Sequence, residues 1–67
     1  LSYEDDRAAA DVLAALGRLP ATAREVLLMR YLLRLSEVEV AEVLGVRVGT
    51  VKSRAARARR RLLEELR

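Results

Sequence analysis

The stretch LSEVEVAEVLGVRVGTVKSRAARARRR, from Leu35 to Arg61, decides the fold of this chain. Ser36 followed three residues later by Glu39 predicts a capping box, in which each side chain accepts a hydrogen bond from a backbone amide of the helix start. Three apolar residues then recur at helical spacing and share one face: Val40, Ala41 and Leu44. Gly45 follows them and can take the left-handed conformation that ends many helices. The sequence therefore predicts a short, well-delimited helix over 36–44.

A second helix is expected to begin near Gly49 or Thr50 and to extend over 49–66. At about 100° per residue, one narrow sector of it is apolar and forms the predicted inward face: Val51, Ala55, Ala58, Leu62 and Leu66. The remaining surface is strongly basic. Its outer arc, opposite the apolar sector, carries Ser53, Ala56, Arg57 and Arg60, with Lys52 at its edge. A helix, a turn containing Gly and a basic second helix together predict a helix-turn-helix, which places its second helix in the major groove of DNA.

Composition and charge narrow the possible functions. The chain of 67 residues makes one small domain, 1–67, and contains neither Cys nor His. Disulfides, thiol nucleophiles, histidine bases and the usual zinc sites are therefore excluded. Residues 1–46 carry five Arg against eight Asp or Glu, a balance of −3, whereas residues 47–67 carry eight Lys or Arg against two Glu, a balance of +6. The basic end predicts an electrostatic footprint for a polyanion.

Position along the second helix suggests a role for each polar residue. Lys52, Ser53 and Arg57 lie early on its outer arc and can reach base edges, since Arg or Lys to guanine is the commonest specific contact. Four arginines are candidates for phosphate contacts, which fix register without reading sequence: Arg54, Arg59, Arg60 and Arg61. The backbone amides at the preceding helix start can also face a phosphate. The predicted DNA-binding residues are Ser36, Glu37, Thr50, Lys52, Ser53, Arg54, Ala56, Arg57 and Arg60.

Several segments in order resemble region 4 of bacterial sigma factors, most closely the extracytoplasmic-function type. These segments are Leu19-Pro20, REVLLMRY over 24–31, LSEVEVAEVLG over 35–45 and GVRVGTVKSRAARARRRL over 45–62. The resemblance implies that the second helix binds the −35 promoter element, with Lys52, Ser53, Ala56 and Arg57 at the base-reading positions. It also implies docking on the β flap of RNA polymerase and control by an anti-sigma factor, in the cytoplasm.

Two further helices are expected before this motif. Ser2 with Asp5 predicts a cap for a helix over 3–17 whose apolar stripe is Val12, Leu13 and Leu16, closed by Gly17. The acidic residues near its start suit the helix dipole; this interpretation is favoured over a paired-carboxylate active site. Leu19-Pro20 opens a helix over 20–33, because Pro suits the first helical position.

The helix over 20–33 is apolar almost all round, which has two interpretations. A helix of that kind is usually buried, and a dense core would account for it. An exposed apolar patch that docks a partner is the other interpretation. We expect at least part of the following set to stay exposed and bind a partner: Leu28, Met29, Leu32 and Leu33.

The expected fold is therefore all-α, a small four-helix domain with a C-terminal helix-turn-helix. No phosphate cradle, catalytic serine environment or metal-ligand cluster is visible, so we expect no enzyme activity, cofactor, metal or small-molecule substrate. No apolar run approaches the roughly 18 residues of a membrane span. The chain begins with Leu1 rather than Met, which suggests a piece of a longer protein.

Two other functions stay open at this point. The chain could be the helix-turn-helix effector domain of a response or quorum-sensing regulator, which shares the four-helix shape. Such domains usually dimerise through the last helix, and the charged tail over 59–67 makes a poor dimer face. The chain could instead be a protein-interaction module whose basic helix binds an acidic partner.

Overall fold

The chain folds as four helices, and residues 3–67 contain no strand. A computed structural model describes the backbone of residues 3–67 and the side chains of residues 6–67. The helices are α1 (Tyr3–Arg18), α2 (Ala21–Leu27) continued by the π-helical segment η1 (Leu28–Leu32), α3 (Glu37–Leu44) and α4 (Val48–Glu65). The predicted all-α fold is confirmed, with every predicted helix end within one residue of the observed one. The predicted cap of Ser2 and Asp5 lies outside the described side chains.

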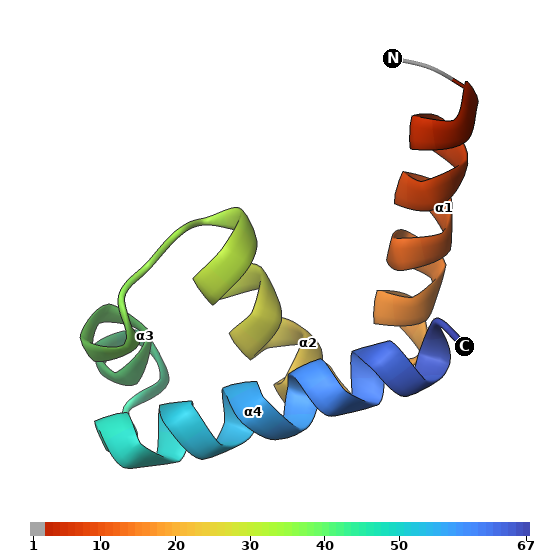
Figure 1. Cartoon of the computed structure of the whole chain (residues 1–67). Coiled ribbons are helices and arrows are strands. Elements are labelled where there is room, and N and C mark those ends of the chain that lie inside the picture. Colours follow the sequence, from red (N-terminus) through yellow and green to blue (C-terminus); the bar gives the residue numbers. More distant parts are fainter. Residues whose placement is uncertain (1–2) are drawn as a thin grey trace.

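The other helices meet on α4, which runs along one side of the molecule (Figure 1). α2 packs most extensively against it, α3 lies at its N-terminal end, and α1 touches it near its C-terminal end. The N-terminal part of α1 projects away from the other helices (Figure 1). Small side chains at Ala55 and Ala58, both buried, let α2 approach α4 closely.

The core consists of two small clusters placed along α4. One holds Val40, Ala41 and Val51 and joins α3 to the first turn of α4. The other holds Leu19, Leu27 and Ala58, with Leu16, Ala23 and Leu62 packed on it, and joins the end of α1 and α2 to the middle of α4. Burying a Val or Leu side chain stabilises a fold by about 1.5–3 kcal/mol, so these few residues hold the orientation of α4 against both neighbours.

The predicted helix-turn-helix is confirmed in its local details. The Ser36 hydroxyl accepts from the Glu39 amide at 3.1 Å, and the Ser36 amide donates to the Glu39 carboxylate at 2.9 Å. Gly45 ends α3 with a φ of 68°. α4 then starts after Arg47, which has no side-chain cap bond. The short turn and the buried contacts of α3 therefore fix where α4 begins.

The second helix differs from the predicted single α-helix over 20–33. Pro20 is its N-cap rather than its first helical residue, and its last turn widens to a π-helix. The Leu33 amide donates to the Leu28 carbonyl, and the Leu35 amide reaches the Met29 carbonyl at 2.9 Å. Arg34 then takes a φ of 56°. This left-handed residue ends the helix where the sequence has no Gly to do so.

Three residues that the sequence places on inward faces are exposed: Val12, Leu13 and Leu66. Leu13 is 68 % exposed and Val12 is also exposed, because α1 diverges from the other helices toward its N-terminus (Figure 1), whereas Ala15, nearer its C-terminal end, is buried. Leu66 belongs to the predicted inward sector of the last helix, yet it is 41 % exposed because it lies beyond the clusters that cover the rest of that sector. Gly17 does not close α1, which continues to Arg18.

Candidate nucleic-acid interface

The outer arc of α4 carries the residues predicted to meet DNA. Lys52, Ser53, Arg57 and Arg60 are exposed, and Ala56 is half-buried. The Ser53 hydroxyl donates to the Gly49 carbonyl at 3.0 Å, so its lone pairs remain available to accept. No hydrogen bond or ion pair to residues 6–67 engages the side chains of Lys52, Arg57 or Arg60. These three cations are therefore available for a ligand from outside.

The two flanks of α4 differ in how their arginines are used. Arg59 donates to the Tyr31 hydroxyl at 2.6 Å, on the side of the apolar groove described below. Arg54 and Arg61 lie on the other flank and have no acceptor among residues 6–67. Arg54, Arg59 and Arg61 were all predicted to contact phosphates. Of these three, Arg59 already donates a hydrogen bond within the protein.

The start of α3 offers fewer free amides than its sequence suggests. The Ser36 amide donates to Glu39, so it would have to leave that carboxylate to donate to a phosphate. The same bond lowers the pKa of Glu39, and the Ser36 hydroxyl contributes as well. The amides of Glu37 and Val38 have no acceptor in the described part of the chain. Thr50, in the first turn of α4, is half-buried.

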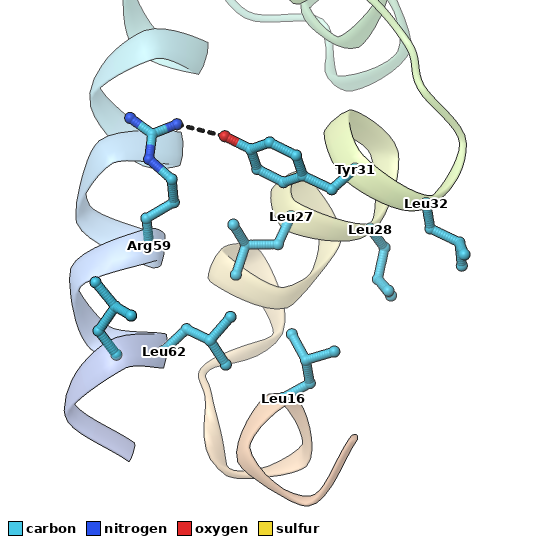
Figure 2. A pocket seen from close by; sticks show the side chains of 8 residues that line it. Leu16, Leu27, Leu28, Tyr31, Leu32, Arg59 and Leu62 are labelled. Atoms are coloured by element: carbon cyan, nitrogen blue, oxygen red, sulfur yellow. Dashed lines mark hydrogen bonds between the residues drawn. The ribbon is translucent and has the colours of Figure 1, made fainter. Parts of the chain in front are cut away.

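An apolar groove lies between α1, α2, η1 and α4 (Figure 2). It has a volume of ≈ 450 Å³ and eight lining residues: Leu16, Leu27, Leu28, Tyr31, Leu32, Arg59, Leu62 and Leu63. The Arg59–Tyr31 hydrogen bond spans it at one end, above Leu27 (Figure 2). An exposed apolar surface with a polar edge is typical of a protein-binding site.

The four residues predicted to bind a partner divide between this groove and other surroundings. Leu28 and Leu32 line the groove, and Leu32 is 71 % exposed. Leu33 is 62 % exposed but does not line it, and Met29 packs inward on the cluster around Val51. The expected exposed apolar surface on this helix is confirmed. The sequence did not reveal Leu16, Tyr31, Leu62 and Leu63 as groove residues, because they come together only through the packing of three helices.

Other kinds of site are not seen in the described residues. Residues 6–67 contain no group of three or more potential metal ligands. No helix among them is both long and apolar enough to cross a bilayer. Asp6 and Asp11 of the acidic cluster are exposed on α1, as a solvated helix start would be.

Comparison with known proteins gives one family and several relatives. The family described as "Sigma-70, region 4" matches residues 9–62. The chain is 41 % identical over 64 residues to the "ECF RNA polymerase sigma factor SigE" of Mycolicibacterium smegmatis, covering 96 % of this chain and 25 % of the relative. It is 42 % identical over 50 residues to the "ECF RNA polymerase sigma factor SigW" of Bacillus subtilis, covering 75 % of this chain and 27 % of the relative. The chain thus spans about a quarter of each relative. No solved structure matches it significantly.

Proposed function

The chain belongs to the family of region 4 of sigma-70 factors, and on this premise we propose that it binds the −35 element of promoters through α4. The observation that carries the proposal is the outer arc of α4. Its cations have no partner among residues 6–67, and the arc follows directly on a capped helix and a left-handed glycine turn. A helix held in this way presents its early residues to the major groove.

Within this proposal each residue of α4 has a role set by its position. Lys52, Ser53 and Arg57 read base edges, because they are exposed on the early and middle part of the outer arc. Ala56 offers only a methyl group, which suits contact with the methyl of thymine. Arg54 and Arg60 hold phosphates, as do Thr50 and the free amides of Glu37 and Val38.

We further propose that the protein acts with RNA polymerase in the cytoplasm. Both relatives are named RNA polymerase sigma factors. The apolar groove around Leu28 and Leu32 supplies a docking surface, and we assign it to the polymerase core, the β flap in particular. An anti-sigma factor that covered the same surface would silence the protein, since it would compete with the polymerase.

The main test is selection of DNA by the assembled polymerase. The protein bound to core polymerase is incubated with duplexes randomised over the −35 region, and the retained DNA is sequenced. We expect one short motif to be enriched, and its preference at one base pair to relax when Arg57 is replaced by Ala. Retention of random sequence without a motif at −35 would contradict the proposal.

The groove has its own matched pair of variants. Leu32 and Leu33 are adjacent and similarly exposed, but only Leu32 lines the groove. We expect Leu32→Ser to weaken binding to the polymerase core and Leu33→Ser to weaken it much less. If the two variants weakened binding equally, the groove would not be part of the docking surface. If neither variant weakened binding, this helix would not take part in docking.

The two other functions predict different results. A response-regulator effector domain would dimerise on its DNA and would not bind a β-flap peptide. A module for acidic partners would show no salt-dependent binding to duplex DNA. The family match favours the sigma assignment over both.

A further inference from the structure

A second hollow, of ≈ 260 Å³, lies between the start of α2 and the middle of α4. We call it the arginine notch. Its lining includes three arginines and no carboxylate: Pro20, Thr22, Ala23, Arg54, Arg57, Ala58 and Arg61. Arg54, Arg57 and Arg61 are spaced by three and four residues, so they stand side by side along one flank of α4.

The three notch arginines, like Arg60, have no acceptor among residues 6–67, whereas Arg18, Arg24, Arg30 and Arg59 do. Arg18 pairs with Glu65 at 2.6 Å, Arg24 donates to the carbonyls at the end of α1, and Arg30 donates to the Leu35 carbonyl. No such contact to residues 6–67 is recorded for any of the three arginines of the notch. Arg54 is moreover half-buried.

This arrangement carries a cost that the protein itself does not offset. Like charges three or four residues apart on a helix destabilise it. A half-buried guanidinium also loses part of its hydration, which a hydrogen-bonded partner would normally compensate. An anion in the notch would reduce both costs, because one phosphate can accept from two guanidinium groups at once.

We propose that the arginine notch holds a backbone phosphate of the DNA duplex, with Thr22 as a further hydrogen-bond donor from α2. The proposal rests on the proposed function, because it assumes that the outer arc of α4 lies on DNA. Arg57 belongs to both surfaces, so a duplex on the outer arc reaches the mouth of the notch. Arg54 and Arg61 then grip the phosphate from α4, and the Thr22 hydroxyl donates from the opposite wall.

A contact of this kind would do more than add affinity. α4 alone could rotate about its axis on the DNA, since its arginines surround much of the helix. A phosphate held between α2 and α4 fixes that rotation, because the two walls of the notch belong to elements joined by the buried core. The notch would therefore set which residues of the outer arc face the bases, without reading any base itself.

The test pairs protein variants with single neutralised phosphates. The protein is bound to core polymerase and titrated with promoter duplexes that each carry one methylphosphonate, scanned along both strands. Arg61→Gln and Thr22→Val report on the notch, and Arg67→Gln removes the same charge beyond the end of α4. We expect Arg61→Gln to weaken binding about three- to tenfold and to reduce the slope of log K against log salt by about 0.9. We expect Arg67→Gln to change neither quantity as much.

The decisive result is coupling at one position. One methylphosphonate should weaken binding of the unaltered protein and of Arg67→Gln, yet have little further effect on Arg61→Gln and a reduced effect on Thr22→Val. If the duplex binds normally but no position shows this coupling, the inference is overturned while the proposed function stands. If no duplex binds at all, the proposed function itself fails. The inference is also overturned, in favour of an acidic partner, if polyglutamate displaces the duplex that carries that methylphosphonate as readily as it displaces the unmodified duplex.

Discussion

Arg57 and Arg60 provide the sharpest test of how the last helix is used. Both are exposed on the outer arc of α4, and neither has an acceptor among residues 6–67. Replacing either with Ala should therefore change the free energy of unfolding by less than about 0.5 kcal/mol. Any larger effect on DNA binding reports on the interface rather than on folding.

The two positions differ in where they lie along the groove. Arg60 is three residues further along α4, which at a rise of 1.5 Å per residue is about 4.5 Å nearer its C-terminal end. Recognition helices contact base edges with their N-terminal residues, and the later ones meet the backbone. We therefore expect Arg57→Ala to cost about 1–3 kcal/mol, which is roughly 5- to 150-fold in affinity, and to relax the sequence preference at one base pair. Arg60→Ala should weaken all sequences alike and reduce the salt slope by about one unit.

The measurement is a titration of the protein bound to core polymerase with matched and mutated −35 elements at several salt concentrations. Arg67→Ala, which removes a charge outside the outer arc, is the matched control. The assignment of roles fails if Arg57→Ala lowers affinity equally for both elements. It also fails if Arg60→Ala changes which element is preferred.

Four predictions concern the stability of the helix-turn-helix and of the turn that precedes it. Ser36→Ala should lower the free energy of unfolding by about 0.5–2 kcal/mol in chemical denaturation, because the first turn of α3 loses its cap. Hydrogen bonds from Ser36 lower the pKa of Glu39 in the folded protein below its usual value of 4.5, so the charged carboxylate stabilises the fold at pH values above 4.5. This contribution should be lost as the pH falls through the lowered pKa. It should be missing in Glu39→Gln. Gly45→Ala should lower the free energy of unfolding by about 1 kcal/mol through the positive φ alone, since a Cβ there meets no atom within 4 Å. Arg34 also has a positive φ, so Arg34→Gly should raise the melting temperature or leave it unchanged.

The helix-turn-helix could be predicted because its signals are local. The reciprocal bonds of Ser36 and Glu39 span three residues, and the left-handed turn at Gly45 needs only that glycine. The seam of Val51, Ala55 and Ala58 follows from helical periodicity within one segment. Each of these features depends on residues within a turn or two of one another, so the sequence determines them almost independently of the rest of the fold.

The parts that were mispredicted depend on contacts between distant residues. Leu13 and Val12 have the periodicity of a buried face, but whether that face is covered depends on the direction in which α1 leaves the other helices. The Arg18–Glu65 ion pair, 47 residues apart in sequence, and the contacts of Leu16 and Leu19 with the cluster around Ala58 join the C-terminal part of α1 to the rest. The widening of η1 likewise has no sequence signal of its own, since a Leu-rich segment suits an α-helix equally well.

The same distinction applies to the candidate site. The sequence identified the outer arc of α4 correctly as a basic, exposed surface, but it could not tell which arginines are already occupied. Arg59 and Arg61 are two residues apart and look alike in the sequence. The Tyr31 hydroxyl accepts from Arg59 and not from Arg61, because η1 lies beside the Arg59 flank of α4. Which hydrogen-bond acceptor an arginine finds thus depends on tertiary packing, even where the exposure of that arginine follows from the periodicity of its own helix.

The division of α4 into two flanks has a consequence for how DNA and a protein partner share it. Arg59 and Leu63 border the apolar groove, whereas Arg54 and Arg61 border the arginine notch. At 100° per residue these two pairs lie on opposite sides of the helix axis, and no residue lines both hollows. A partner in the groove therefore need not displace DNA from the outer arc or the notch. Under the proposed function, the polymerase and the promoter can hold the same helix at once, as a factor that joins the two requires.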